Sequence, residues 1–116
     1  MTVDELPPVH LSPKIDFAIL GEHADARRDV AANIAAELGE NRGYVNTRYS
    51  VLRNQGLLEP IGPSENSGVH QITPRGIAAY RLREHYGTSD YDQLVDERAT
   101  GITIKDPQII DEAADD

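Results

Sequence analysis

The stretch NRGYVNTRYSVLRNQGLLEP, residues 41–60, constrains the fold of this chain more than any other. Val45, Tyr49 and Leu52 recur at i, i+4 and i+7, so they lie on one face of a helix. A glycine follows the last of them, and glycine is favoured just past a helix C-terminus. The opposite face carries no carboxylate. We therefore predict a helix over about residues 43–55 with a buried stripe and a hydrogen-bonding outer face.

Two helices are expected before this one. The first begins at Ser12-Pro13, a favourable N-cap followed by proline at the first helical position, and it ends at Gly21. The second is capped by Asp25 and ends at Gly39, and apolar residues recur every four positions within it. Only a short turn separates it from the helix over 43–55. The pair has the pattern of a helix-turn-helix.

A hairpin and two further helices are expected next. Leu57–Ile61 and Val69–Ile72 are β-like segments, and the loop Gly62–Gly68 between them has turn composition throughout. Helices are predicted over Arg75–Tyr86 and Tyr91–Ala99. Three helices followed by a hairpin describe a winged helix-turn-helix. We expect a mainly α fold with a small β-hairpin, an extra C-terminal helix and an acidic tail.

This interpretation divides the chain into three parts. Residues 1–11 form an N-terminal arm, residues 12–87 the winged domain, and residues 88–116 a short helix and tail. The helix Arg75–Tyr86 has more apolar surface than one core contact requires. It forms either one wide core-facing stripe or two contacts, of which the second is to another protomer. Dimeric DNA readers need such a contact, so we expect a homodimer through the N-terminal and C-terminal helices.

The net charge of −9 is unevenly distributed. Residues 1–40 carry a net charge of −5, residues 41–88 carry +3, and residues 89–116 carry −7. The positive middle third coincides with the predicted helix over 43–55. Charge asymmetry of this kind indicates a nucleic-acid contact better than the total does.

The composition excludes several classes of protein. There is no cysteine, so no disulfide framework or thiolate site is possible. No apolar run approaches the ~20 residues of a membrane span, and the N-terminus lacks the features of a signal peptide. The four histidines are scattered without metal-ligand spacing, and no catalytic motif appears. We expect a cytoplasmic protein that is not an enzyme, has no metal or cofactor, and does not bind membranes.

Lysine is rare in this chain. It has two lysines against nine arginines, with abundant Asp, Glu and Ala. This usage is typical of proteins from salt-loving archaea, whose acidic surfaces keep them soluble in concentrated salt. The alternative is an ordinary acidic mesophilic protein. On the halophilic interpretation the acidity reflects the solvent and not the partner.

Four segments carry a resemblance to a known family: DFAIL, DVAANIAAELG, YVNTRYSVLRNQGLLEPIG and SGVHQITPRGIAAY. Together they cover about residues 12–86, and they resemble the winged-helix regulators of haloarchaea related to the phage phi-H repressor. The resemblance implies a small, usually dimeric, sequence-specific DNA-binding transcriptional regulator that is repressor-like.

The residues expected to contact double-stranded DNA share acid-free positions on or beside the helix over 43–55. They are Arg42, Tyr44, Asn46, Thr47, Arg48, Ser50, Arg53 and Asn54. Arginine and asparagine read guanine and adenine bidentately, and hydroxyl groups suit phosphates or base edges. The alternative is that the arginines only solvate an exposed face. Tyr49 belongs to the buried stripe, so we expect it in the core.

The predicted wing offers amide and hydroxyl groups in place of the Arg or Lys that often grip DNA. Its candidate contacts are Ser64, Asn66 and Ser67, and we expect them to be minor. A different function also fits the pattern: a winged-helix module that binds another protein and not DNA directly. The acidic flanks favour that alternative, and the positive middle third opposes it.

Overall fold

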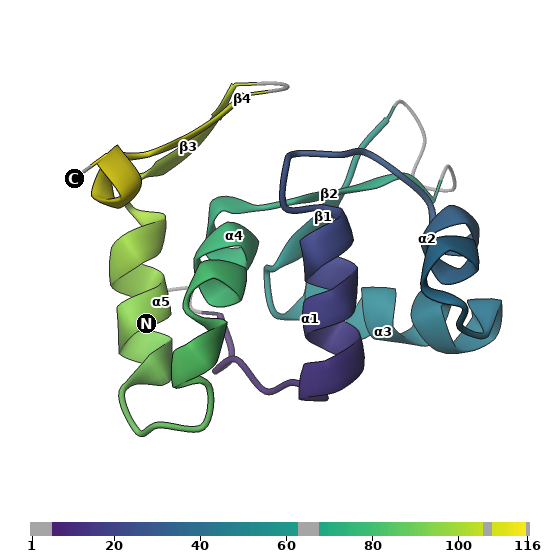
Figure 1. The fold of residues 1–116 in the computed structure, drawn as a ribbon, viewed down its shortest axis with the longest axis horizontal. Coiled ribbons are helices and arrows are strands. Elements are labelled where there is room, and N and C mark those ends of the chain that lie inside the picture. Colours follow the sequence, from purple (N-terminus) through teal and green to yellow (C-terminus); the bar gives the residue numbers. More distant parts are fainter. Residues whose placement is uncertain (1–5, 63–67, 106–107, 116) are drawn as a thin grey trace.

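The computed structural model describes residues 6–62, 68–105 and 108–115 (Figure 1). The elements in chain order are α1 Pro13–Glu22, α2 Ala31–Leu38, α3 Arg42–Asn54, β1 Leu58–Pro60, β2 His70–Ile72, α4 Pro74–Arg81, the 3₁₀ turn η2 Arg83–His85, α5 Tyr91–Ala99, β3 Ile102–Lys105, β4 Gln108–Asp111, and the 3₁₀ turn η3 Glu112–Asp115. Over these described residues the fold is α+β, with five α-helices and two antiparallel hairpins. None of the helices described is long and apolar enough to cross a membrane.

One aliphatic core joins the elements. Its fully buried side chains come from α1, α2, α3, both strands of the first hairpin, α4 and α5. Val45, Tyr49 and Leu52 are all buried, which confirms the stripe predicted for α3. Tyr49 is 1% exposed and therefore belongs to the core, as expected.

Local capping signals explain three of the helix boundaries. The left-handed conformation of Gly39, with φ +68°, ends α2 as predicted. The side chain of Asn41 accepts a hydrogen bond from the Tyr44 amide at 3.0 Å and starts α3. Thr73 does the same for α4 by accepting from the Gly76 amide at 3.0 Å.

The predicted start of the second helix is wrong. Asp25 does not cap it, because α2 begins only at Ala31. Residues 23–30 form an irregular link whose Asp29 pairs with His70 of β2 through two backbone hydrogen bonds of 2.8 and 3.1 Å. This pairing competes with helix formation, since the backbone at Asp29 is extended and bonded to a strand.

The first hairpin lies where the sequence indicated. In β1 and β2, Leu58 pairs with Ile72 and Pro60 with His70. The strands pass close to the start of α4, and a Cβ at Gly76 would lie 2.1 Å from the Leu57 carbonyl oxygen. Only glycine fits that approach, so the glycine of the TPRG segment has a packing role.

Both apolar sides of α4 are covered within the chain. Ile77, Ala78 and Ala79 are fully buried, and the Tyr91 hydroxyl of α5 donates to the Ala79 carbonyl at 2.6 Å. Helix α1 packs on α4 as well, and Figure 1 shows α4 between α1 and α5. The structure therefore agrees with one wide core-facing surface on this helix.

The segments before α1 and after α5 pack against the helices, whereas an arm and a tail were predicted there. Val9 and Leu11 are buried, and the Leu11 amide donates to the Tyr86 hydroxyl at 2.8 Å. At the other end, β3 and β4 form a hairpin that lies beside α4. From the sequence, only a short helix and an acidic tail are expected in this part of the chain.

Candidate nucleic-acid interface

The outermost face of α3 is free of carboxylates. Gly43, Thr47 and Asn54 are exposed there, and Ser50 is half-buried. These residues lie opposite the buried stripe on a helix of 3.6 residues per turn. Thr47 is exposed and donates its hydroxyl hydrogen to the Gly43 carbonyl at 3.1 Å, so its oxygen can still accept a hydrogen bond. The face presents small polar groups that could approach a base edge.

The flank of α3 nearest the first hairpin carries positive charge. Arg42, Asn46 and Arg53 are exposed on this flank. The Arg42 side chain makes no hydrogen bond or ion pair with the described residues. Arg53 donates to Nε2 of His70 at 3.2 Å and therefore spans from the helix to β2. Two guanidinium groups thus border the polar face.

A cleft of about 640 Å³ opens beside this flank. Its walls are the first residues of α2, the first residues of α3 and one glycine of the hairpin; they include Val30, Ala31, Ala32, Arg42, Gly43, Asn46 and Gly68. The N-terminal residues of two helices therefore line one cleft, and at the start of α2 the Val30 amide already donates to the Asp29 carboxylate at 2.7 Å. A helix N-terminus carries partial positive charge and favours an anion such as a phosphate.

Arg48 lies elsewhere. Its Nε and Nη2 donate to the two carboxylate oxygens of Asp16 at 2.9 and 2.7 Å. Asp16 is fully buried on α1, and the Arg48 side chain is only 17% exposed. Hydrogen bonding to Asp16 raises the pKa of Arg48. The structure therefore places this guanidinium between α1 and α3, apart from the outer face that the sequence analysis assigned to it.

The Asp16–Arg48 pair could not be found from local sequence. The two residues are 32 positions apart, and Asp16 looks like an ordinary acid in the first turn of a helix. Asp16 also accepts from the Ser12 amide at 2.7 Å. The carboxylate thus fixes the start of α1 and the position of α3 together.

Tyr44 occupies the opposite flank of α3, toward the start of α1. It is 44% exposed and is one of the few large apolar side chains that remain open. It lines a second hollow, between α1 and the turn joining α2 to α3. Tyr44 and Arg48 are therefore separated from the hairpin flank, where Arg42, Asn46 and Arg53 lie.

A buried polar network supports α3 from behind. The His23 Nδ1–H donates to the Arg27 carbonyl at 2.8 Å, so Nε2 accepts from the Tyr49 hydroxyl at 2.6 Å. The ring of Tyr49 lies edge-on to His70 at 4.9 Å between centroids. Burial lowers the pKa of His23 and of His70 and raises that of Tyr49. The network requires both histidines to be neutral.

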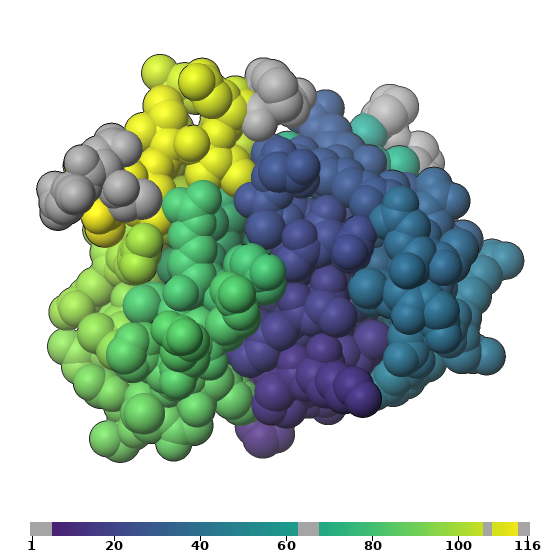
Figure 2. Space-filling model, in the orientation of Figure 1, coloured from purple at the N-terminus to yellow at the C-terminus, as the bar shows by residue number. Residues whose placement is uncertain are grey.

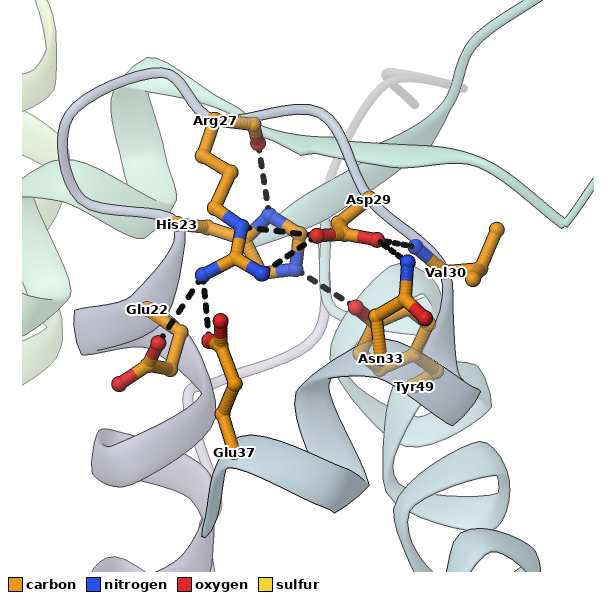
Figure 3. Close-up of polar contacts among 8 residues, drawn as sticks. All are labelled: Glu22, His23, Arg27, Asp29, Val30, Asn33, Glu37 and Tyr49. Carbon is orange, nitrogen blue, oxygen red and sulfur yellow. Dashed lines mark hydrogen bonds and ion pairs between the residues drawn. The ribbon is translucent and has the colours of Figure 1, made fainter.

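Arg27 ties the link before α2 to the helices on either side of it (Figure 3). It donates to Glu22 at the end of α1 at 3.1 Å, to Glu37 of α2 at 2.6 Å and to Asp29 at 2.8 and 2.5 Å. Burial opposes ionisation of Asp29, but hydrogen bonds from Val30, Asn33 and Arg27 outweigh it and lower its pKa. This hub fixes the orientation of α2 against α1.

The wing candidates Ser64, Asn66 and Ser67 lie outside the described residues. Across the part of the chain that is described, no group of His, Cys, Asp and Glu is arranged to hold a metal ion. Comparisons with protein families, with curated proteins and with solved structures found no match to this chain.

Proposed function

We propose that this protein is a sequence-specific DNA-binding transcriptional regulator, repressor-like, with a winged helix-turn-helix formed by α1, α2, α3 and the first hairpin. Helix α3 is the recognition helix and enters the major groove. One observation carries the proposal: in a chain of net charge −9, the exposed face of α3 has no carboxylate and is bordered by Arg42 and Arg53.

The contacts divide by position on α3. Thr47, Ser50 and Asn54 face the base edges, because they lie farthest from the core. Arg42 and Asn46 sit at the cleft where two helix N-termini meet, which suits a backbone phosphate. Arg48 acts on DNA only indirectly, by holding α3 against α1 through Asp16. The proposal therefore has fewer residues in direct contact with DNA than were predicted from the sequence.

Selection of bound fragments from a random DNA pool at high salt tests the proposal. Enrichment of one motif supports sequence-specific binding, and a palindromic motif supports a dimer with two half-sites. If no motif is enriched over the input pool, the proposal fails and the protein-interaction module becomes the better interpretation. The acidic outer thirds of the chain, −5 and −7, favour that second candidate.

A pair of variants tests whether the cleft beside Arg42 contacts DNA. Arg42→Ala should weaken binding to the selected site and to unrelated DNA by a similar factor, because it removes a guanidinium that contacts a backbone phosphate. Lys105→Ala is the matched control, since Lys105 is an exposed cation on β3, away from α3. Equal affinities of both variants for the selected site would exclude the cleft from the DNA interface.

A further inference from the structure

A second hollow lies on the flank of α3 that the proposed DNA contact does not use. It is a groove of about 620 Å³ between the start of α1 and the turn from α2 to α3, and apolar side chains line it, among them Leu11, Ile15 and Leu38. Figure 2 shows the surface of α1, in indigo, directly against the blue surface of α2 and α3 on this side of the molecule. The groove is large enough to admit a side chain from another molecule.

Tyr44 stands at the rim of this groove. It is 44% exposed, and among the described large apolar side chains only Leu6, at 46%, is comparably exposed. An exposed aromatic ring beside an apolar groove is the arrangement found at the centre of protein interfaces, where such rings supply much of the binding. The exposed ring and the apolar groove together favour another protein as the partner that binds in the groove.

The charges at the groove indicate which protein binds there. Lys14 of α1 and Glu40, just after α2, both line the groove, and both are exposed. Within the described residues neither forms an ion pair. A two-fold axis brings residue i of one copy against residue j of the other, and the reverse contact repeats it. One lysine and one glutamate on the same patch are therefore complementary to themselves.

Total charge limits where two copies can meet. Each copy carries a net charge of −9, so most faces of two copies repel each other. The groove carries one charge of each sign and a largely apolar lining, so two copies can meet there without added repulsion. The Asp16–Arg48 pair directly joins α1 and α3, so the walls are already fixed before association, which lowers its entropic cost.

We infer that this groove is the contact surface between two copies of the chain. Tyr44 of each copy enters the groove of the other, and Lys14 faces Glu40 of the partner subunit. The inference rests on the proposed function only in supplying the dimer that two DNA half-sites require. It removes Tyr44 from the DNA contacts and leaves the outer face of α3 open.

Charge reversal of the full-length chain tests the inference by sedimentation equilibrium without DNA. Lys14→Glu and Glu40→Lys should each raise the dimer dissociation constant by about tenfold or more, since each places like charges opposite one another. The double variant K14E/E40K should return it toward the wild-type value, because the pair is restored in reverse. Tyr44→Ala should weaken the dimer without rescue.

Lys105→Glu is the matched control, because it makes the same charge change on β3, away from the groove. Circular dichroism checks that each variant folds. A monomeric wild-type chain, an unrescued double variant, or equal dissociation of Lys105→Glu and Lys14→Glu would each overturn the inference. DNA binding is measured separately, so a dimer that selects no DNA motif would refute the proposed function and leave the dimer surface standing.

Discussion

Three arginines of the positive middle third, Arg48, Arg75 and Arg81, direct their guanidinium groups to partners inside the fold. Arg48 meets buried Asp16, and Arg75, only 7% exposed, donates to Asp96 at 2.9 Å and to the backbone of Pro7 and Gln55. A guanidinium has five donors in a fixed fork and can join several segments at once. The charge of +3 over residues 41–88 therefore overstates the positive charge available to a ligand.

Asp16→Ala should destabilise the protein severely. The change leaves the Arg48 guanidinium largely buried without its carboxylate, and breaking such a pair costs about 3–5 kcal/mol. Denaturant unfolding measures the loss. Asp25→Ala is the control: Asp25 is exposed, with no hydrogen bond or ion pair among the described residues, so its loss should lie within about 0.5 kcal/mol. Similar losses for both variants would show that the ion pair contributes little.

Stability should fall as pH drops below about 6.5, the ordinary pKa of histidine. Burial lowers the pKa of His23 and of His70, so the unfolded chain binds more protons than the folded chain in this range. The stabilisation is complete above about pH 6.5 and is lost as pH falls toward the lowered folded values. Unfolding free energies at about pH 7.5 and about pH 5 measure it.

His23→Gln provides the matched comparison for this pH dependence. Glutamine keeps one donor for the Arg27 carbonyl and one acceptor for the Tyr49 hydroxyl but does not titrate. The variant should lose less stability than the wild type between the two pH values, while His70 retains part of the dependence. An unchanged difference would mean that His23 does not carry the effect.

At the scale of elements, the sequence predicted what local signals encode. Thr73-Pro74, Gly39 and the periodic stripe of α3 mark their helices, and the structure agrees with each. The prediction from sequence failed where a contact with a residue far along the chain decides the local structure. The extended backbone at Asp29 is bonded to His70, so Asp25 caps nothing. The same holds for Arg48, whose partner is 32 residues away.

The second hairpin shows the same dependence on distant partners. Asp111 of β4 is buried and accepts from Arg81 of α4 at 2.6 Å and from Arg98 of α5 at 2.9 and 3.2 Å. Burial opposes ionisation of Asp111, but the two arginines outweigh it and lower its pKa. A two-stranded hairpin is marginal alone, so this clamp and the apolar contacts of Ile102 hold it to the helices.

Asp111→Ala should loosen the second hairpin locally. Amide hydrogen exchange of the residues in β3 should become faster, while exchange in α3 stays as in the wild type, because α3 contributes no residue to the clamp. Glu112→Gln is the neighbouring control, since Glu112 is exposed and its side chain makes no hydrogen bond or ion pair with the described residues. Protection of β3 that survives Asp111→Ala would show that apolar packing alone holds the hairpin.

The whole molecule carries a net charge of −9, and its proposed ligand, DNA, is also an anion, so the total charge opposes binding. Arg48 and Arg75 are paired inside the fold and are not available to offset this repulsion. Arg42 and Arg53 are the arginines left exposed on α3. Affinity must then come mainly from base-edge hydrogen bonds, apolar contacts and helix N-termini directed at phosphates. Such contacts release few counterions and lose little strength in concentrated salt.

The salt dependence of DNA binding should therefore be shallow. Neutralising one phosphate lowers the slope of log affinity against log salt by about 0.9, so two arginines per protomer predict a slope of about −2 for each half-site. Binding of the selected site across a salt series measures it, and Arg42→Ala should bring the slope closer to zero by about 1. A slope several times steeper would require many more cations at the interface than α3 exposes. Such a slope would contradict a DNA contact made by α3 with two exposed arginines.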